Sequence, residues 1–463
     1  MIARALLIVC VVFGVSAGRA EDVMRRNREM LAKFVAAGLR GGNAYRMLQE
    51  LTRRAPHRLS GSADADTAVR VTRQLLACVG ADSVWTEPCM VPRWERGPVE
   101  SAVVTPFRDR RAPFPLAVCA LGGSVATPSG GVSAEVVEVR SFEELRALGA
   151  RVNGKIVFFN RPMDPGVLNT FEAYGGAVDQ RSRGAVEAAR AGARAALVRS
   201  MTLAQDNVPH TGSLSYLDTV PKIPAAAVGI EDADMLSALL RRDSRARVTL
   251  TLTCRTLPDA PSANVIGEIR GRENPREIIL VGGHLDCWDK GAGAHDDAAG
   301  CVHAIEVLHL FRELGIVPRC TIRAVMFMNE ENGSRGGAAY ASAALRDRER
   351  HVAAIESDRG GFAPRGFTVQ ADSSTLERML RWKPLFEDIA AGRIVQGYSG
   401  VDVLQTVKQG AIGIGLDVGD HRYFDVHHSA NDVVESVNPR ELEMGAVVTA
   451  FLCYLLSEEG LGP

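Results

Sequence analysis

The amino-acid sequence predicts an α/β fold: a mostly parallel, mixed sheet flanked by helices on both faces, with an inserted β-rich domain. From residue 262 onward, apolar runs of strand length alternate with helical patterns, which is typical of a sheet covered on both sides. Between about residues 105 and 256, short strand-like runs are separated by loops rich in Pro, Gly and Ser. The length of 463 residues allows more than one folded unit.

Residues 1–20 are expected to be a signal peptide outside the fold. Arg4 supplies a positive charge, the apolar run Ala5–Val15 follows, and small residues then fit a cleavage site. The run is too short to span a bilayer, and the alternative is an uncleaved signal anchor. We therefore expect a secreted or extracellular protein, or a lysosomal one, with no membrane partner.

The composition excludes several classes of protein. Lys and Arg number 54 and Asp and Glu 55, so the net charge is −1. The chain therefore has no excess of positive charge of the kind that binds nucleic acid. Hydrophobic residues make up 46% and charged residues 24%, an ordinary globular mixture. Eight cysteines follow Cys10, none in a CxxC pair, which argues against a cysteine-ligated zinc site and leaves any disulfide pairing open.

The first part of the chain reads as helices that lead into the inserted segment. Residues 22–55 have a charged helical pattern, Ala63–Cys78 is an expected amphipathic helix, and Val91–Gly97 leads into a short strand. The insert contains one expected alanine-rich helix, Ala185–Ala193, and four expected strands: Ala134–Val139, Lys155–Phe159, Ala195–Val198 and Val248–Leu252. We place a catalytic domain in 21–104 and 257–463 and the inserted domain in 105–256.

The last part alternates strands with helices. The expected strands are Ile278–Gly282, Ile322–Met328, Val352–Glu356 and Ala411–Leu416. The expected helices cover about residues 298–314, 337–349, 374–390 and 439–457. Open α/β sheets place their sites at the carboxyl ends of the strands, so polar residues just after these strands are the first candidates for a functional site.

Two polar clusters follow the first of these strands. His284 and Asp286 are two residues apart on an extended segment and point to the same side. The imidazole can bind a divalent metal, while the carboxylate fixes its tautomer. Asp296 and Asp297 open the next helix, where capping is the simpler explanation, above all for Asp297.

Three further clusters follow later strands. Glu330 and Glu331 come directly after a buried strand, where unpaired carboxylates are costly, so one can bind a metal while the other serves as a general base. Asp358 lies just after the next strand, and His427 and His428 lie before the last helix. Imidazole and carboxylate ligands suit zinc, and shared carboxylates suit two ions about 3.5–4 Å apart.

The order of these motifs, HLD, GAHDD, NEEN, ESD and HHS, resembles the co-catalytic zinc peptidases that include bacterial aminopeptidases and glutamate carboxypeptidases. The resemblance covers nearly all of the chain after the signal peptide. It is also carried by five longer stretches: HRLSGS (57–62), VPRWERG (91–97), GAVEAARAGARAALVRS (184–200), GHLDCWD (283–289) and VESVNP (434–439).

The resemblance implies a role for each site residue. It implies two zinc ions per chain and makes Asp296 the bridging ligand and Glu330 the general base. It also places Asp286 behind His284, a cis peptide before Asp297, a protease-associated-like insert over the cleft, and a homodimer. The remaining metal ligands it implies are His284 and Asp358 for one ion and Glu331 and His428 for the other.

One departure from the family leaves the oxyanion donor open. Many relatives have Tyr just before the last histidine ligand, where this chain has His427; His427 is either a substitute donor or a packing residue. His303 and His309 lie on a helix and are not expected to be ligands. Trp94 and Arg96 either pack at the domain junction or line the binding cleft, and we favour packing.

The resemblance implies a secreted di-zinc exopeptidase that hydrolyses dipeptides or short peptides with free termini. Two alternatives remain. One is a zinc aminopeptidase that acts on longer peptides, because specificity depends on loops. The other is a binding protein that keeps the fold without metals, which the complete set of ligand-type residues disfavours.

Overall fold

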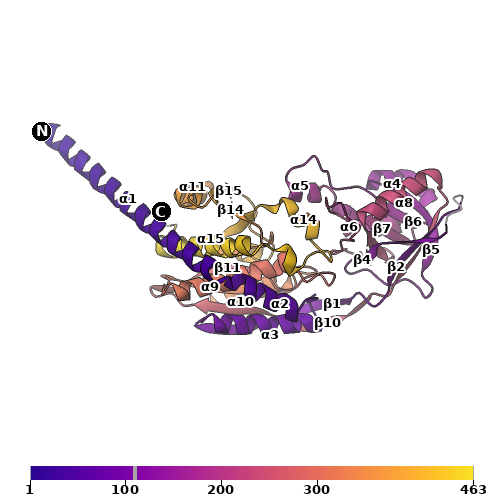
Figure 1. The fold of residues 1–463 in the computed structure, drawn as a ribbon, viewed down its shortest axis with the longest axis horizontal. Helices are drawn as coiled ribbons and strands as arrows, with labels where there is room; N and C mark the ends of the chain where they lie inside the picture. Colours follow the sequence, from indigo (N-terminus) through magenta and orange to yellow (C-terminus); the bar gives the residue numbers. More distant parts are fainter. Residues whose placement is uncertain (1, 108–111, 462–463) are drawn as a thin grey trace.

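The computed structural model describes the backbone of residues 2–107 and 112–461 and the side chains of residues 21–107 and 112–461. Two bodies lie side by side along the long axis, each built on its own eight-stranded sheet (Figure 1). The expected α/β fold with a mixed sheet is confirmed. The side chains of the expected signal peptide lie outside the described residues, and the signal peptide stays a prediction.

The first sheet has a parallel centre with antiparallel edges. Strands β12, β11, β13 and β16 are parallel neighbours, and β1, β10 and β14 add antiparallel pairings. In spatial order the strands are β1 (Ser83–Glu95), β10 (Arg255–Ile269), β12 (Cys320–Phe327), β11 (Asn274–His284), β13 (Arg350–Glu356), β16 (Ile412–Val418), β14 (Pro364–Gln370) and β15 (Arg393–Gln396).

Helices cover both faces of this sheet, so its central strands are buried on both sides. One face packs in the main apolar core against α1 (Ile2–Gly41), α2 (Asn43–Arg54), α3 (Ala63–Cys78), α9 (Ala299–Glu313), α11 (Ser373–Leu380), α12 (Lys383–Glu387) and α15 (Pro439–Glu458). The other face packs in a smaller core against α10 (Arg335–Asp347) and α13 (Leu404–Lys408).

One expected helix is divided in two. The helix expected near 374–390 forms as α11 and α12, with a break at Arg381 and Trp382. Pro384 lies in the first turn of α12. Because proline lacks a backbone N–H, it fits a helix start and interrupts a continuous helix.

The second body contains more helix than the expected β-rich domain. Its strands run in the order β3 (Phe114–Leu116), β2 (Glu100–Thr105), β9 (Arg247–Leu252), β5 (Val132–Val139), β6 (Ile156–Phe159), β7 (Ala195–Arg199), β8 (Ala225–Val228) and β4 (Val118–Ala120). Its helices are α4 (Phe142–Leu148), α5 (Thr170–Gly175), α6 (Asp179–Ser182), α7 (Gly184–Arg190) and α8 (Ile230–Arg242).

This composition corrects two sequence-based expectations. Strands β5 to β8 are parallel neighbours, and parallel strands need helical crossovers, which explains the extra helices. Strand β2 pairs with β9, so the chain enters the second sheet at Glu100, earlier than the expected boundary at 104/105. A protease-associated domain remains a prediction for this body.

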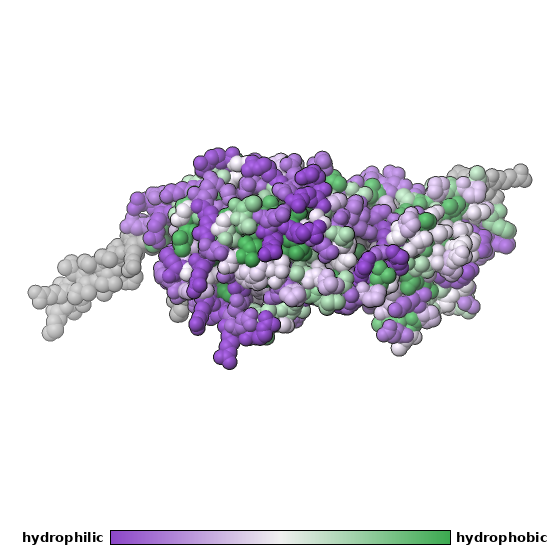
Figure 2. Space-filling view, turned by 90° about the horizontal axis from the view of Figure 1, so that it is seen from below, coloured by the Kyte–Doolittle hydropathy of each residue, from purple (hydrophilic) through white to green (hydrophobic). Residues whose placement is uncertain are grey.

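The surface and the cysteines agree with a globular protein. Figure 2 shows hydrophilic side chains over much of one face, with apolar residues scattered between them. Within the described ranges, no helix is both long and apolar enough to cross a membrane. The eight cysteines after Cys10 are all free thiols in this structure.

Candidate di-metal centre

The parallel strands bring the predicted motifs to one edge of the first sheet. His284 is the last residue of β11, Glu330 and Glu331 follow β12, and Asp358 follows β13. His428 comes from the loop that joins α14 (Tyr423–Val426) to α15. Because β11, β12 and β13 are parallel neighbours, their carboxyl ends meet here.

The first group of ligand-type side chains gathers around His284. Its Nε2 atom lies 3.1 Å from Oδ1 of Asp296 and 3.4 Å from Oδ1 of Asp358. One nitrogen and two carboxylate oxygens therefore converge on one point, within 4.8 Å of one another.

The second group gathers around His428 and shares Asp296 with the first. Nε2 of His428 lies 3.2 Å from Oδ2 of Asp296 and 3.1 Å from Oε2 of Glu331. Asp296 thus turns one carboxylate oxygen toward each histidine. This is the arrangement that a carboxylate bridging two cations would have.

The chemistry of these side chains fits a pair of divalent cations. Oε1 of Glu331 is buried and has no hydrogen-bond donor among the described residues, and Oδ2 of Asp296 makes no hydrogen bond although it lies 3.2 Å from Nε2 of His428. Buried carboxylate oxygens without a hydrogen bond are costly, and a bound cation would satisfy them. Two imidazoles with three carboxylates are ligands of the kind that zinc accepts.

The pKa values report an excess of negative charge in the site. Burial lowers the pKa of His284, but Asp358 and Asp296 outweigh burial and raise it well above its ordinary value. Burial opposes protonation of His428 too, yet Glu331 and Asp296 raise its pKa to about 10. Bound cations at this position would neutralise the negative charge of the same carboxylates.

His427 lies beside the second group. Its Nε2 atom is 3.7 Å from Oδ2 of Asp296, and its ring stacks on that of His428 with 3.5 Å between centroids. Tyr174, Tyr423 and Phe424 surround it: Tyr423 and Phe424 on α14 and Tyr174 on α5. The imidazole is therefore close enough to serve either as a donor to the substrate or as a further metal ligand.

Asp286 contacts both His284 and the loop of the two glutamates. Nδ1 of His284 lies 2.9 Å from the backbone oxygen of Asp286 and 3.9 Å from its carboxylate. Oδ1 of that carboxylate accepts hydrogen bonds from the backbone N–H groups of Asn329 (2.6 Å) and Glu330 (3.0 Å). The structure therefore adds a second task for Asp286, which is to hold the Glu330 backbone.

Asp297 has the capping role that the sequence favoured. Its Oδ1 accepts a hydrogen bond of 2.9 Å from the backbone N–H of Gly300 in the first turn of α9. Its Oδ2 accepts one of 3.0 Å from the backbone N–H of His284. The peptide bond between Asp296 and Asp297 is cis, as the family resemblance implied.

Two supporting residues were missed by the sequence analysis. The guanidinium of Arg58, which is fully buried, donates to the backbone oxygens of Leu285 (2.6 Å), Ala292 (2.5 Å) and Gly293 (2.7 Å). Asp432 accepts from the backbone N–H groups of His295 (2.7 Å) and Asp296 (3.1 Å). The HRLSGS stretch was the one available signal for Arg58.

The remaining side chains behave mostly as expected. His303 is fully buried and satisfied by Ser357 (2.9 Å) and the backbone oxygen of Leu442 (3.0 Å), so it is no ligand in this structure. Arg96 pairs with Asp289 and Glu100 at the junction of the two bodies, which supports packing. Trp94 packs in the core of the second body and also lines the cleft between the two bodies.

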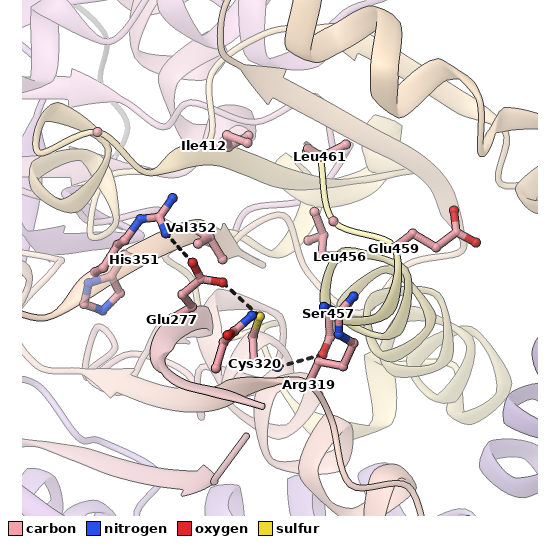
Figure 3. Close-up of a pocket in the computed structure, with 14 residues that line it drawn as sticks. Glu277, Arg319, Cys320, His351, Val352, Ile412, Leu456, Ser457, Glu459 and Leu461 are labelled. Carbon is pink, nitrogen blue, oxygen red and sulfur yellow. Dashed lines mark hydrogen bonds and ion pairs between the residues drawn. The ribbon is translucent and has the colours of Figure 1, made fainter. Parts of the chain in front are cut away.

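A cleft of about 530 Å³ opens at the site between the two bodies. Glu330 and Glu331 line it from the first body, and residues 213–216 line it from the second. A separate pocket of about 540 Å³ lies at the amino ends of the parallel strands, where Glu277, Arg319 and Cys320 line it (Figure 3). Its charged groups are already paired, Glu277 with Arg350 and Arg319 with Glu273.

Comparisons with known proteins place this geometry in a family. A sequence model described as Peptidase family M28 matches residues 264–452, which include every predicted ligand and Glu330. Carboxypeptidase Q from Bos taurus is 35% identical over 415 residues, which cover 90% of this chain and 85% of that protein. The chain belongs to peptidase family M28. The resemblance seen in the sequence is therefore confirmed.

Other relatives of this M28 peptidase support the same assignment. Carboxypeptidase Q from Homo sapiens is 34% identical over 90% of this chain and 85% of its own length. The crystal structure of a Peptidase M28 precursor from Shewanella amazonensis SB2B has a TM-score of 0.88 and 32% identity, and the match covers 94% of this chain and 97% of that one.

A more distant neighbour shares the fold alone. The zinc aminopeptidase from Bacillus subtilis has a TM-score of 0.64 and 20% identity, over 89% of this chain and 94% of that one. The M28 peptidase and that enzyme therefore have the same architecture across both bodies.

Proposed function

We propose that this M28 peptidase is a secreted di-zinc exopeptidase that hydrolyses dipeptides or short peptides with free termini. The observation that carries the proposal is the carboxylate of Asp296, with one oxygen facing His284 and the other facing His428. In this proposal His284, Asp296 and Asp358 hold one ion, and Asp296, Glu331 and His428 hold the other.

The ions and the protein have separate tasks in the reaction. When bound, zinc supplies the Lewis acidity that activates water and polarises the substrate carbonyl. Glu330 then accepts the proton of the attacking water and passes it to the leaving amine. Burial and the neighbouring carboxylates of Asp358 and Glu331 raise the pKa of Glu330 well above its ordinary value, although His284 opposes this rise. Bound cations would lower this pKa again and so keep Glu330 ionised as a base.

The preference for short peptides rests on the relatives and on the cleft. The relatives named carboxypeptidase Q cover nearly the whole chain, and the second body forms one wall of the cleft that holds Glu330. The expected signal peptide supports secretion or delivery to the lysosome. A homodimer belongs to the same proposal, on the family resemblance alone.

A panel of dipeptides tests this function. Purified protein is incubated with free dipeptides and with versions blocked at the amino or the carboxyl terminus, with and without added zinc, and released amino acids are measured. We expect release from the free dipeptides that depends on zinc and is absent in Glu330→Gln. Preferred cleavage of long peptides from the amino terminus would favour the aminopeptidase alternative, and no release under any condition would contradict the proposal.

A further inference from the structure

The cleft that contains Glu330 has one wall from each body of the protein. Pro92, Arg93 and residues 330–333 line it on the side of the first sheet. The loop of residues 213–216 and Lys222 line it on the side of the second sheet. The hydroxyl of Ser213 donates a hydrogen bond of 2.5 Å to the backbone oxygen of Glu331, so the two walls are joined next to the proposed metal ligand.

The two cationic side chains that line this cleft differ in their pairing. Arg93 forms an ion pair of 2.8 Å with Glu95. Lys222 is exposed and has no ion pair with any described residue; its Nζ atom lies 5.8 Å from the centre of the Tyr216 ring. Lys222 therefore offers an uncompensated positive charge in the same cleft as the proposed general base.

The Tyr216 ring is a fixed surface for this lysine. The Tyr216 hydroxyl donates a hydrogen bond of 2.5 Å to the backbone oxygen of Ile223 and accepts one of 3.2 Å from the backbone N–H of Val125. Contact with an aromatic face restricts a long side chain without neutralising its charge. The ammonium group is thus held at the cleft and remains free to bind an anion.

We propose that Lys222 is the specificity residue that binds the free α-carboxylate of a short peptide substrate. This inference rests on the proposed exopeptidase function. When the scissile bond of a short peptide lies at Glu330, its free α-carboxylate lies in the same cleft. A substrate that is blocked or longer at its carboxyl end has no negative charge at that position. A lysine in a partly enclosed cleft would recognise that charge and raise the affinity for free acids.

Arg181 also has no ion pair with any described residue, and its surroundings differ from those of Lys222. It is buried on α6, 3.5 Å from Nδ1 of His428 and over the Tyr174 ring, and it does not line the cleft. Its position behind a proposed metal ligand favours support of that ligand over contact with a substrate carboxylate.

The test compares a free-acid dipeptide with its carboxyl-terminal amide. For the zinc-loaded wild type we expect kcat/KM to be at least about tenfold higher on the free acid, mostly through KM, which is the size of one charged hydrogen bond. Lys222→Met should remove this preference and leave activity on the amide unchanged. Lys222→Arg should keep the preference, and so should Arg93→Met, the control for the other lining cation.

The outcomes distinguish a failure of the proposed role of Lys222 from a failure of the proposed peptidase function. A wild type that cleaves no peptide contradicts the proposed function and, with it, the inference. A wild type that cleaves acid and amide equally, or a Lys222→Met variant that keeps the preference, overturns the role of Lys222 and leaves the peptidase function standing. Loss of the preference in Arg93→Met but not in Lys222→Met would also overturn it.

Discussion

The carboxylate of Asp286 accepts a hydrogen bond of 3.0 Å from the backbone N–H of Glu330. The same oxygen accepts one from the neighbouring residue Asn329, at 2.6 Å. Asp286 is fully buried directly after β11, whereas Glu330 follows β12. The position of the proposed base therefore depends on a carboxylate that belongs to the neighbouring strand.

Removal of this carboxylate should lower turnover without removing the metals. Asp286→Ala removes the acceptor of two backbone N–H groups, at about 1–3 kcal/mol for the buried one of Asn329 and less for the half-buried one of Glu330. We expect kcat to fall about 10–100-fold, as for other residues that orient metal-site groups. Asp286→Asn keeps one acceptor oxygen and should lose less. Steady-state kinetics with metal analysis decide this, and an unchanged kcat in Asp286→Ala would contradict it.

The adjacent glutamates should respond differently to the same substitution. Glu330→Gln removes the proposed proton acceptor and should lower kcat by about 10²–10⁴ while metal content stays full. Glu331→Gln removes a proposed ligand, 3.1 Å from Nε2 of His428, and should lose metal. Metal content and kcat are measured on both variants, and the opposite pattern would exchange the two roles.

His427 can be tested with a substitution that keeps an aromatic ring. If His427 is an oxyanion donor, His427→Phe should lower kcat by the equivalent of about 3–4 kcal/mol in activation free energy, with metal content unchanged. If His427 is a metal ligand near Asp296, the same variant should instead have a lower metal content. Full metal content with near-normal kcat would leave His427 a packing residue.

A buried carboxyl far from the cleft should make stability depend on pH. Burial raises the pKa of Glu306 on α9 to about 8, although a hydrogen bond from Asn43 opposes this. The folded state then binds a proton that the unfolded chain releases near pH 4.3, about the ordinary pKa of Glu. The stabilisation is complete below that pH and is lost as the pH rises through about 8.

The test of this prediction is the free energy of unfolding across that interval. Between about pH 5 and 8, we expect the free energy of unfolding of Glu306→Gln to fall by about 3 kcal/mol less than that of the wild type. Glu377→Gln, an exposed glutamate on α11, is the control and should keep the wild-type slope. Equal slopes in wild type and Glu306→Gln would show that Glu306 is ionised in the folded protein.

The sequence predicted the centre of the first sheet better than its edges. Strands β11, β12 and β13 are buried on both faces and appear as apolar runs, so periodicity finds them. The long strands β1 and β10 are partly exposed, and the polar residues 255–262 carry no such signal. Helix α8 was missed because short apolar runs dominated the interpretation of the insert.

The site residues also fall into those that the sequence predicted and those that it did not. His284, Asp296 and Glu331 were predictable because their side chains are of metal-ligand type and lie just after a strand or at the start of a helix. Arg58 and Asp432 were not, because they act on backbone oxygens and N–H groups that only the folded chain brings to them. The sequence did not predict a role for Lys222, because its position in the cleft depends on how the two bodies meet.

The metal content of the purified protein tests the proposal that Asp296 bridges two zinc ions. Elemental analysis of the zinc-loaded wild type should give two zinc ions per chain, and Asp296→Ala should lose both because it contributes to both groups. Asp358→Ala, which touches one group, should lose the zinc of that group first. A wild type with almost no metal, not restored by added zinc, would show that Asp296 bridges no pair of ions.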